Sequence, residues 1–333
     1  MLAQSLVPKA AYTSILAVLL LVTANLSSYA QHIYYTIPAR QAGNIIGQKP
    51  ESVGLYSYKE TDSTIKHLAW QNEIAYGITV RDSLLFLSGL DGVLRSLDNG
   101  KSWKLVTDWR MPEAFQVYFD PAKPKTIYMI CSTGIWKSND LGDTWISINS
   151  GLKTTSQTYI NTLLVLPGKL IAGTADGIFI KKTDSKKWKL AALQGKEIHN
   201  IKQDPYNSKH LIVATEDFGT YESIDEGTTW KIIGADFHDK TVYSIAFDPA
   251  HAGTVYCGGY KLGLCRYDSE SHSWLQLSNQ VSGKSIHSIT INHSGKIYMG
   301  LINSGLFYSQ DGGFTATATS ETTGKIWQVQ VAP

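Results

Sequence analysis

The chain has 333 residues, of which 43% are hydrophobic, 11% aromatic and only 17% charged, so its surface relies on neutral polar groups. The apolar content excludes a disordered chain, and three cysteines exclude a disulfide scaffold. A formal net charge of +2 gives no reason to expect nucleic acid or an anionic membrane as a partner. The length suits two average domains or one large all-β unit.

Residues 1–30 have the layout of a secretory signal peptide. Lys9 supplies a positive charge, residues 10–24 form an uncharged apolar run, and Ser28 and Ala30 are small residues before a cleavage point at Gln31. The alternative is an uncleaved anchor, but a run of about 15 residues is short for a hydrocarbon core of about 30 Å. The mature protein is therefore expected to be secreted or periplasmic, with no membrane attachment after cleavage.

A short motif recurs along the rest of the chain. SLDNGKSW, SNDLGDTW and SIDEGTTW all read S-x-D-x-G-x-x-W, and SQDGGFTA keeps all but the tryptophan. Two weaker copies, KTDSKKW and YDSESHSW, fill the gaps. Self-similarity at a fixed period is typical of repeat architectures, so the repeat governs the prediction of the fold.

Within each repeat the sequence predicts strands. A glycine opens a short apolar strand before each copy, and these glycines are 42, 43, 42, 44 and 42 residues apart, with Gly54 as a less regular seventh. Residues 243–277 illustrate the pattern, because YSIAFDP, TVYCGGY, GLCRYD and SWLQL are rich in β-branched and aromatic residues and are separated by turn residues. No sustained 3.6-residue period follows the first thirty residues, so little helix is expected. The six glycines are Gly92, Gly134, Gly177, Gly219, Gly263 and Gly305.

The motif residues have a mechanical role in this interpretation. Between the third and fourth strands the chain must reverse tightly, and an aspartate can accept hydrogen bonds from the backbone of its own turn. Glycine permits positive φ there, and tryptophan places a large apolar face between neighbouring sheets. We therefore assign a structural role, and no catalytic one, to Ser96, Asp98, Gly100, Trp103, Ser138, Asp140, Gly142, Trp145, Ser223, Asp225, Gly227, Trp230, Ser309, Asp311 and Gly313.

Four-stranded sheets that repeat radially make a β-propeller. Residues 325–332 match the start of a repeat, but no second strand follows them. Since a propeller closes when one terminus completes the blade that the other begins, these residues are predicted to form the inner strand of the blade that contains Gly54 to Ser57. The sequence thus predicts an all-β fold, a single seven-bladed β-propeller of four-stranded antiparallel blades over residues 31–333, with six blades as the alternative.

The motif hairpins, together with turns such as Asp120-Pro121 and Asp248-Pro249, resemble the BNR or Asp-box propeller superfamily over residues 50–333. That superfamily includes sialidases, xyloglucan-active glycosidases, sortilin-type receptor domains and photosystem II assembly factors. The resemblance is specific for the fold and unspecific for the activity, because this fold hosts enzymes and binding proteins alike.

The resemblance implies that ligands bind on the face opposite the motif turns, around the central channel. Acids beside aromatics in the loops of that face suit a sugar or a peptide, whereas ordinary polar loops on a solvated rim are the alternative for any one residue. The candidate ligand contacts are Trp109, Arg110, Glu216, Asp217, Phe218, His238 and Tyr260.

A second pattern marks the start of the inner strands. In most blades an aromatic residue or histidine is followed by a small polar residue, which could line the channel and hold a ligand or, as we prefer, help to close the propeller. The pairs are Phe115-Gln116, His199-Asn200, Tyr243-Ser244, His287-Ser288 and Trp327-Gln328, with Ile160-Asn161 and Tyr76-Gly77 as variants.

Sialidase chemistry is disfavoured, because the sialidases of this superfamily clamp a carboxylate with three arginines. The chain has five arginines. Arg95 and Arg266 are expected inside third strands, and Arg81 at a turn on the motif face. Only Arg110 and Arg40 could reach the opposite face, so no triad can be assembled.

A glycoside hydrolase with two carboxylates on the open face is the alternative function, with Asp108, Glu197 and Asp236 as candidate catalytic residues. Pairs of acids about 5 to 9.5 Å apart would suit either stereochemical outcome. No pair carries a recognisable motif, and the xyloglucan-active enzymes generally form a cleft between two propellers. A photosystem-assembly role would require an arginine-rich patch that the repeats lack.

The preferred interpretation is a non-catalytic propeller that binds a glycan or an extracytoplasmic protein through the face opposite the motif turns. No nucleic acid, cofactor or metal is expected, and the protein is expected to be a monomer. Cys257 and Cys265 flank a predicted hairpin turn, so a disulfide between them and buried free thiols both remain open.

Overall fold

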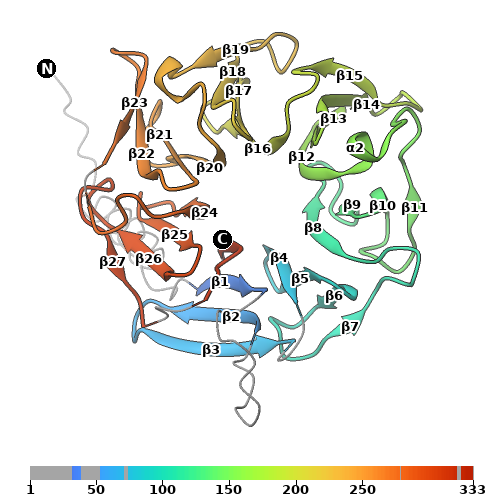
Figure 1. Cartoon of the computed structure of the whole chain (residues 1–333). Coiled ribbons are helices and arrows are strands. Elements are labelled where there is room, and N and C mark those ends of the chain that lie inside the picture. The colour runs from blue at the N-terminus through green and yellow to red at the C-terminus, as the bar shows by residue number, and fades with distance from the viewer. Residues whose placement is uncertain (1–31, 39–52, 71–73, 278, 321–323, 333) are drawn as a thin grey trace, which may run out of the picture.

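The computed structural model describes residues 32–38, 53–70, 74–277, 279–320 and 324–332. The described strands form seven four-stranded antiparallel sheets, which stand as blades around a central axis (Figure 1). The predicted all-β seven-bladed propeller is therefore confirmed. The predicted signal peptide, residues 1–30, and Arg40 lie outside the described residues.

Six blades take their four strands from one continuous stretch of chain each. From the axis outward they are β4 (Ala75–Arg81), β5 (Leu84–Gly89), β6 (Gly92–Ser96) and β7 (Lys104–Leu105); β8 (Ala114–Phe119), β9 (Ile127–Cys131), β10 (Gly134–Ser138) and β11 (Ile146–Ser147); β12 (Ile160–Leu166), β13 (Lys169–Thr174), β14 (Gly177–Lys182) and β15 (Lys189–Ala192); β16 (Ile198–Asp204), β17 (Asn207–Thr215), β18 (Thr220–Ser223) and β19 (Lys231–Ile233); β20 (Val242–Phe247), β21 (Val255–Gly259), β22 (Gly263–Asp268) and β23 (Ser273–Gln276); β24 (Ile286–Ile291), β25 (Ile297–Leu301), β26 (Gly305–Ser309) and β27 (Thr317–Ala318).

Helix is confined to two short turns among the described residues, α2 (Thr155–Thr158) and the 3₁₀ turn η1 (Ala235–Phe237). Both lie in connections between blades. Neither approaches the length or the apolar character that a helix needs to cross a membrane, and the same holds for the rest of the described chain.

The seventh blade joins the two ends of the chain. Its strands, from the axis outward, are β28 (Gln328–Val331), β1 (His32–Ile37), β2 (Gly54–Lys59) and β3 (Thr64–Ala69). Tyr35 pairs with Val329 on one side and with Tyr56 on the other. The C-terminal segment is thus the inner strand of the blade that contains Gly54, as the sequence predicts.

Apolar side chains fill the space between neighbouring blades. The second strand of a blade is covered on both of its faces, which explains sequences such as Ile127–Cys131, in which all five residues are buried. One cluster joins Ile33, Tyr35 and Ile326 of the closing blade to Tyr298 of the blade before it. The core is therefore a ring of interfaces, and each interface needs both of its blades.

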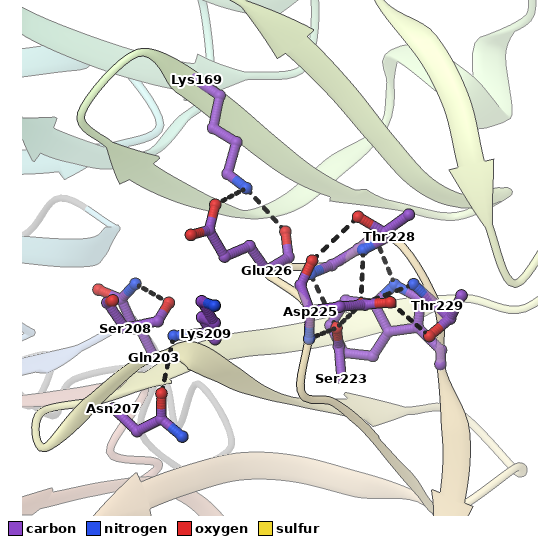
Figure 2. A network of polar contacts seen from close by, with 12 residues as sticks. Lys169, Gln203, Asn207, Ser208, Lys209, Ser223, Asp225, Glu226, Thr228 and Thr229 are labelled. Atoms are coloured by element: carbon purple, nitrogen blue, oxygen red, sulfur yellow. Dashed lines mark hydrogen bonds and ion pairs between the residues drawn. The ribbon is translucent and has the colours of Figure 1, made fainter.

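The motif turn is held by its own aspartate. Asp225 accepts hydrogen bonds from the backbone N–H groups of Thr229 (2.8 Å) and Thr228 (3.0 Å) and from the Thr229 hydroxyl (2.6 Å), as Figure 2 shows. The Ser223 hydroxyl donates to Asp225 (2.7 Å) and accepts from the N–H of Gly227 (2.8 Å). The bonds from Thr229 and Ser223 lower the pKa of Asp225 to about 2. Equivalent turns lower the pKa of Asp98, Asp140 and Asp311 to about 2.

The motif turns also bind the preceding blade. Lys169 donates from Nζ to the carbonyl oxygen of Glu226 (2.8 Å) and to its carboxylate (3.0 Å) (Figure 2). Arg95 likewise donates to the carbonyl oxygen of Leu141 in the next blade (2.8 Å). The turns therefore contribute to the contacts between blades as well as to the reversal of the chain.

The motif tryptophan lies between blades, as predicted. Trp145 packs in one apolar cluster with Phe86 and Val106 of the preceding blade, and its Nε1 donates to the carbonyl oxygen of Val106 (2.7 Å). In the copy without tryptophan, Ala316 occupies the corresponding position and is buried.

The repeated glycine fixes the start of the third strand. Gly92 has φ +114°, and a Cβ atom there would collide with the hydroxyl of Thr107. Each third strand begins at this glycine and ends at its motif turn. The inner strand runs in the same direction, because both strands are antiparallel to the second strand between them. The inner strands therefore begin on the face opposite the motif turns, which we call the open face.

The closing blade can be tested by truncating one side chain. Ile326 is fully buried, and Ile326→Ala is expected to lower the free energy of unfolding by about 2–5 kcal/mol. Equilibrium urea denaturation measures the change. Leu275→Ala on β23, where the side chain is 49% exposed, is the matched control, with an expected change within about 0.5 kcal/mol. Equal effects of the two substitutions would contradict closure by this segment.

The low pKa values of the motif aspartates predict that the protein loses stability in acid. Their pKa is about 2 in the fold against a reference of 3.8, so the unfolded chain binds more protons between these values. Their contribution is fully present above about pH 4 and is lost as the pH falls through about 2. The thermal midpoint of unfolding should fall as the pH is lowered from about 4 to about 2, and it should fall less steeply in Asp98→Asn than in the wild type. Leu97→Ala, a neutral change at an exposed neighbour, should keep the wild-type slope, and an unchanged slope in Asp98→Asn would contradict the assignment.

Candidate ligand-binding site at the open end of the channel

The six inner strands that begin a blade each carry a β-bulge at their second residue. A register shift leaves one residue unpaired there, and a bulge redirects the side chain of that residue. Trp327 occupies the corresponding position just before β28. Seven side chains therefore converge at one level of the channel, on the open face: Tyr76, Phe115, Asn161, His199, Tyr243, His287 and Trp327.

All of these positions except Asn161 carry an aromatic ring. Together with the ring of Tyr159, these rings form a nearly closed circle, which we call the aromatic collar. Successive ring centroids are 4.3 to 5.8 Å apart, at or just below the usual range of about 4.5–7 Å for paired aromatic side chains. The collar borders a hollow of about 130 Å³. Its members, in spatial order, are Tyr159, Phe115, Tyr76, Trp327, His287, Tyr243 and His199.

Polar groups complete the circle between His199 and Tyr159. Asn161 donates from Nδ2 to the carboxylate of Glu197 (3.0 Å), and Nε2 of His199 bonds the carboxylate of Glu216. The backbone N–H of Glu216 donates to the carbonyl oxygen of Glu197 (3.0 Å). The collar is thus apolar on most of its circumference and acidic on one side.

We call Glu113, Glu197, Glu216 and Asp217 the acidic rim, since their charges reach the tyrosines of the collar. Burial has the largest effect in raising the pKa of Tyr243. The neighbouring Glu216, Tyr260 and Asp217 raise it further, in decreasing order of their effect. Burial, Glu113 and Glu197 do the same for Tyr159. On the other side, Nζ of Lys325 lies 4.1 Å from the ring centre of Trp327. The rim can therefore accept hydrogen bonds from a ligand whose apolar face contacts the collar.

His287 belongs to the neutral part of the collar. Its Nδ1 lies 2.7 Å from the carbonyl oxygen of Trp327, so Nδ1 carries the proton and donates. Burial lowers the pKa of His287 to about 4, although the bond to Trp327 opposes the shift. The imidazole is therefore uncharged near neutral pH and presents a flat ring to the hollow.

Most of the polar residues that follow the ring positions connect neighbouring inner strands, in agreement with the role in closure preferred above. Ser244 accepts a hydrogen bond from the backbone N–H of Ile289 in the next blade (3.0 Å), and Ser288 accepts one from Val329 (3.1 Å). Gln328 accepts one from Ile78 (2.6 Å) across the closing interface. These groups are engaged in holding inner strands together.

One of the predicted inner-strand pairs is shifted by one residue. Ile160 is fully buried and pairs with Thr174, and Asn161 occupies the bulge. The pair equivalent to Tyr243-Ser244 is therefore Asn161-Thr162, where the sequence pattern had suggested Ile160-Asn161. Tyr159, one residue before the strand, supplies the aromatic ring of this blade.

Below the collar, the seven inner strands enclose the channel, a cavity of about 440 Å³. This volume lies within the range of cavities that hold small organic ligands. Nowhere among the described residues, this site included, do three His, Cys, Asp or Glu side chains gather where they could hold a metal ion. Cys257 and Cys265 face each other on β21 and β22 as buried free thiols.

Four of the candidate residues lie beside the collar, and Phe218 follows one of them, Asp217, in the same loop. Glu197 and Glu216 belong to the acidic rim, and so does Asp217, which accepts a hydrogen bond from the Thr241 hydroxyl (2.7 Å). Phe218 is 39% exposed beneath Nζ of Lys196, 3.4 Å from its ring centre, and Tyr260 is 54% exposed. These residues come from adjacent loops of two neighbouring blades.

Asp108, Trp109 and Arg110 lie away from the collar. Arg110 donates to both carboxylate oxygens of Asp108, at 2.6 to 3.2 Å, which lowers the pKa of that acid. The guanidinium lies 6.0 Å from the ring centre of Trp136 on β10, a third strand, so this loop covers the outer part of its blade. Trp109 is 87% exposed.

Asp236 and His238 also lie toward the perimeter. They flank Phe237 in η1, which packs against Trp274 of β23, an outermost strand. Of the three candidate catalytic residues, Glu197 alone lies beside the collar. Sequence reasoning missed Glu113 and Tyr159 as site residues, although both directly precede the start of an inner strand.

The structure defines a class of fold, the seven-bladed β-propeller. No family model matches the chain. It is 25% identical over 190 residues to Xyloglucanase Xgh74A of Acetivibrio thermocellus, a match that covers 54% of this chain and 20% of that protein. The chain thus spans about a fifth of the length of this relative.

Solved structures share the fold. YCF48 bound to D1 peptide has a TM-score of 0.60 at 13% identity, over 85% of this chain and 87% of that one. The extracellular domain of the one-component system BT4673 from B. thetaiotaomicron has a TM-score of 0.63 at 15% identity, over 79% of this chain and 36% of that one. At these identities the likeness shows the propeller fold, and function must be argued from the site.

Proposed function

We propose that this protein is a non-catalytic binding propeller that recognises a glycan or a protein through its open face. The observation that carries the proposal is the aromatic collar beside the acidic rim at the mouth of the channel. Flat apolar rings suit the faces of sugars and the side chains of peptides, while carboxylates accept hydrogen bonds from hydroxyl and N–H groups. The peptide in the YCF48 complex and the xyloglucanase match support these two ligand classes.

The proposed contacts are the collar, the acidic rim, Phe218 and Tyr260. Trp109, Arg110 and His238 remain candidate contacts at the perimeter, separate from this site. We further propose a single propeller over residues 31–333, a monomer, and export by the signal peptide of residues 1–30. The extracellular domain among the structural neighbours supports the proposed export.

Binding through the collar predicts a loss of affinity on ring removal. Tyr243→Ala should weaken binding of a ligand found on glycan and peptide arrays by roughly tenfold to a hundredfold, because aromatic anchors at the centre of a site carry much of the binding energy. Titration calorimetry measures the affinity. Trp109→Ala removes a more exposed ring at the perimeter and should leave the affinity unchanged. A larger loss of affinity in Trp109→Ala than in Tyr243→Ala would place the site at the perimeter.

Glycoside hydrolysis is the second candidate function. It is favoured by the proximity of Glu197 and Glu216, which are joined by a backbone hydrogen bond beside the collar, and by the xyloglucanase match. Two carboxylates on either side of a glycosidic bond are the usual requirement of such enzymes.

A hydrolase would release reducing sugars from plant or bacterial polysaccharides. Our proposal predicts no turnover by the wild-type protein, and identical backgrounds for Glu197→Gln, Asp108→Ala and Asp236→Ala. Turnover in the wild type that Glu197→Gln reduces by about a hundredfold or more would establish catalysis instead. Turnover that persists in all three variants would point to a contaminating enzyme, and repeated purification would remove it.

A further inference from the structure

A single charged side chain lines the channel below the collar. Among the described residues that line the cavity, Lys202 is the only lysine, arginine, aspartate or glutamate. It lies three residues after His199 on β16, which places it about 10 Å below the collar along the strand. The collar thus leads into a channel with one cation in it.

Lys202 has no partner in the part of the chain that the structure describes. Its side chain is exposed to the channel, and no ion pair or hydrogen bond joins its ammonium to another described residue. The channel wall around the ammonium restricts its hydration, and this desolvation lowers the pKa of Lys202. Lys296 of the same protein pairs with Glu60 at 2.6 Å, whereas the ammonium of Lys202 is left available to a ligand in the channel.

The acidic rim and Lys202 together give the site a polarity. Negative charge predominates beside the collar, on Glu113, Glu197, Glu216 and Asp217, and positive charge lies below it. A ligand with negative charge at its outer end would be repelled by the rim. A ligand that carries hydrogen-bond donors at its outer end and a negative group at its inner end would match both levels.

We propose that the ligand of the open face inserts a carboxylate past the aromatic collar to pair with Lys202, with its hydroxyl or N–H donors at the acidic rim. This inference rests on the proposed function, because it assigns the chemistry of a ligand that binds there. A uronic acid and the C-terminal end of a peptide both carry this chemistry. The channel volume of about 440 Å³ accommodates either.

The test compares acids with their neutral partners by titration calorimetry on the whole mature chain. One pair is glucuronate and glucose, and the other is an acetylated triglycine with a free or an amidated C-terminus. At least one acid is expected to bind roughly tenfold or more tightly than its neutral partner, as a charge-assisted hydrogen bond provides. The pair that shows the preference identifies the source of the carboxylate.

Lys202→Met should abolish this preference while keeping the volume of the side chain. Lys189→Met, which removes the same charge from the exposed outermost strand β15, is the matched control and should keep it. Because Lys202→Met removes a charge that has no partner in the described structure, its thermal midpoint should be no lower than that of the wild type. A strong fall would show that Lys202 has a structural partner and would overturn the inference.

The remaining outcomes separate the two proposals. Equal binding of an acid and its neutral partner, weakened by Tyr243→Ala, would overturn the carboxylate inference and leave the proposed function intact. A preference that survives in Lys202→Met would do the same. If neither acid binds, the carboxylate inference fails, and array ligands with the Tyr243→Ala comparison still decide whether the open face binds at all.

Discussion

Closure of the ring is the constraint on which the rest of this structure depends. Each blade has two apolar faces, and neither can be covered unless a neighbour stands on each side. The last two uncovered blade faces are covered by the seventh sheet, which combines strands from both ends of the sequence. In this sheet Tyr35 lies between Val329 and Tyr56. The channel and its aromatic collar exist only because this sheet completes the circle, since Trp327 and Tyr76 meet across it.

The two faces of the ring are built for different purposes. On the motif face, aspartates and backbone groups saturate one another within tight turns, and cations from the preceding blade bind those turns. On the open face, the bulges interrupt the strand pairing at one level and direct side chains inward. The hydrogen bonds that a bulge gives up are partly replaced by Ser244, Ser288 and Gln328, which connect one inner strand to the next.

Charge is distributed by depth at the open end. The collar is largely neutral, in part because burial keeps His287 unprotonated. The carboxylates of the acidic rim lie in the loop before β8, in the loop before β16 and between β17 and β18, and Lys202 lies below the collar. Such an arrangement is uncommon in a region that only supports a fold, because an unpaired ammonium in a channel adds nothing to packing. The proposed recognition of a polar ligand accounts for it.

The sequence by itself determined the blade architecture, because each repeat encodes local interactions. The bonds of Asp225 reach only three and four residues along the chain, and the glycine that opens each strand is required by its own φ angle, so both leave a readable pattern. The closing strand was predictable as well, since residues 325–332 begin a repeat that only the other end of the chain can complete. Only the tertiary structure decided which loop residues share a site. Asp108 and Glu197 look alike in the sequence, yet one is bound to Arg110 over an outer strand and the other lies beside the collar, because the side chain's position depends on how far each loop reaches over its blade. The position of Lys202 in the channel could not be predicted from the sequence either, because which residues of an inner strand face the channel depends on how the seven inner strands are arranged around the axis.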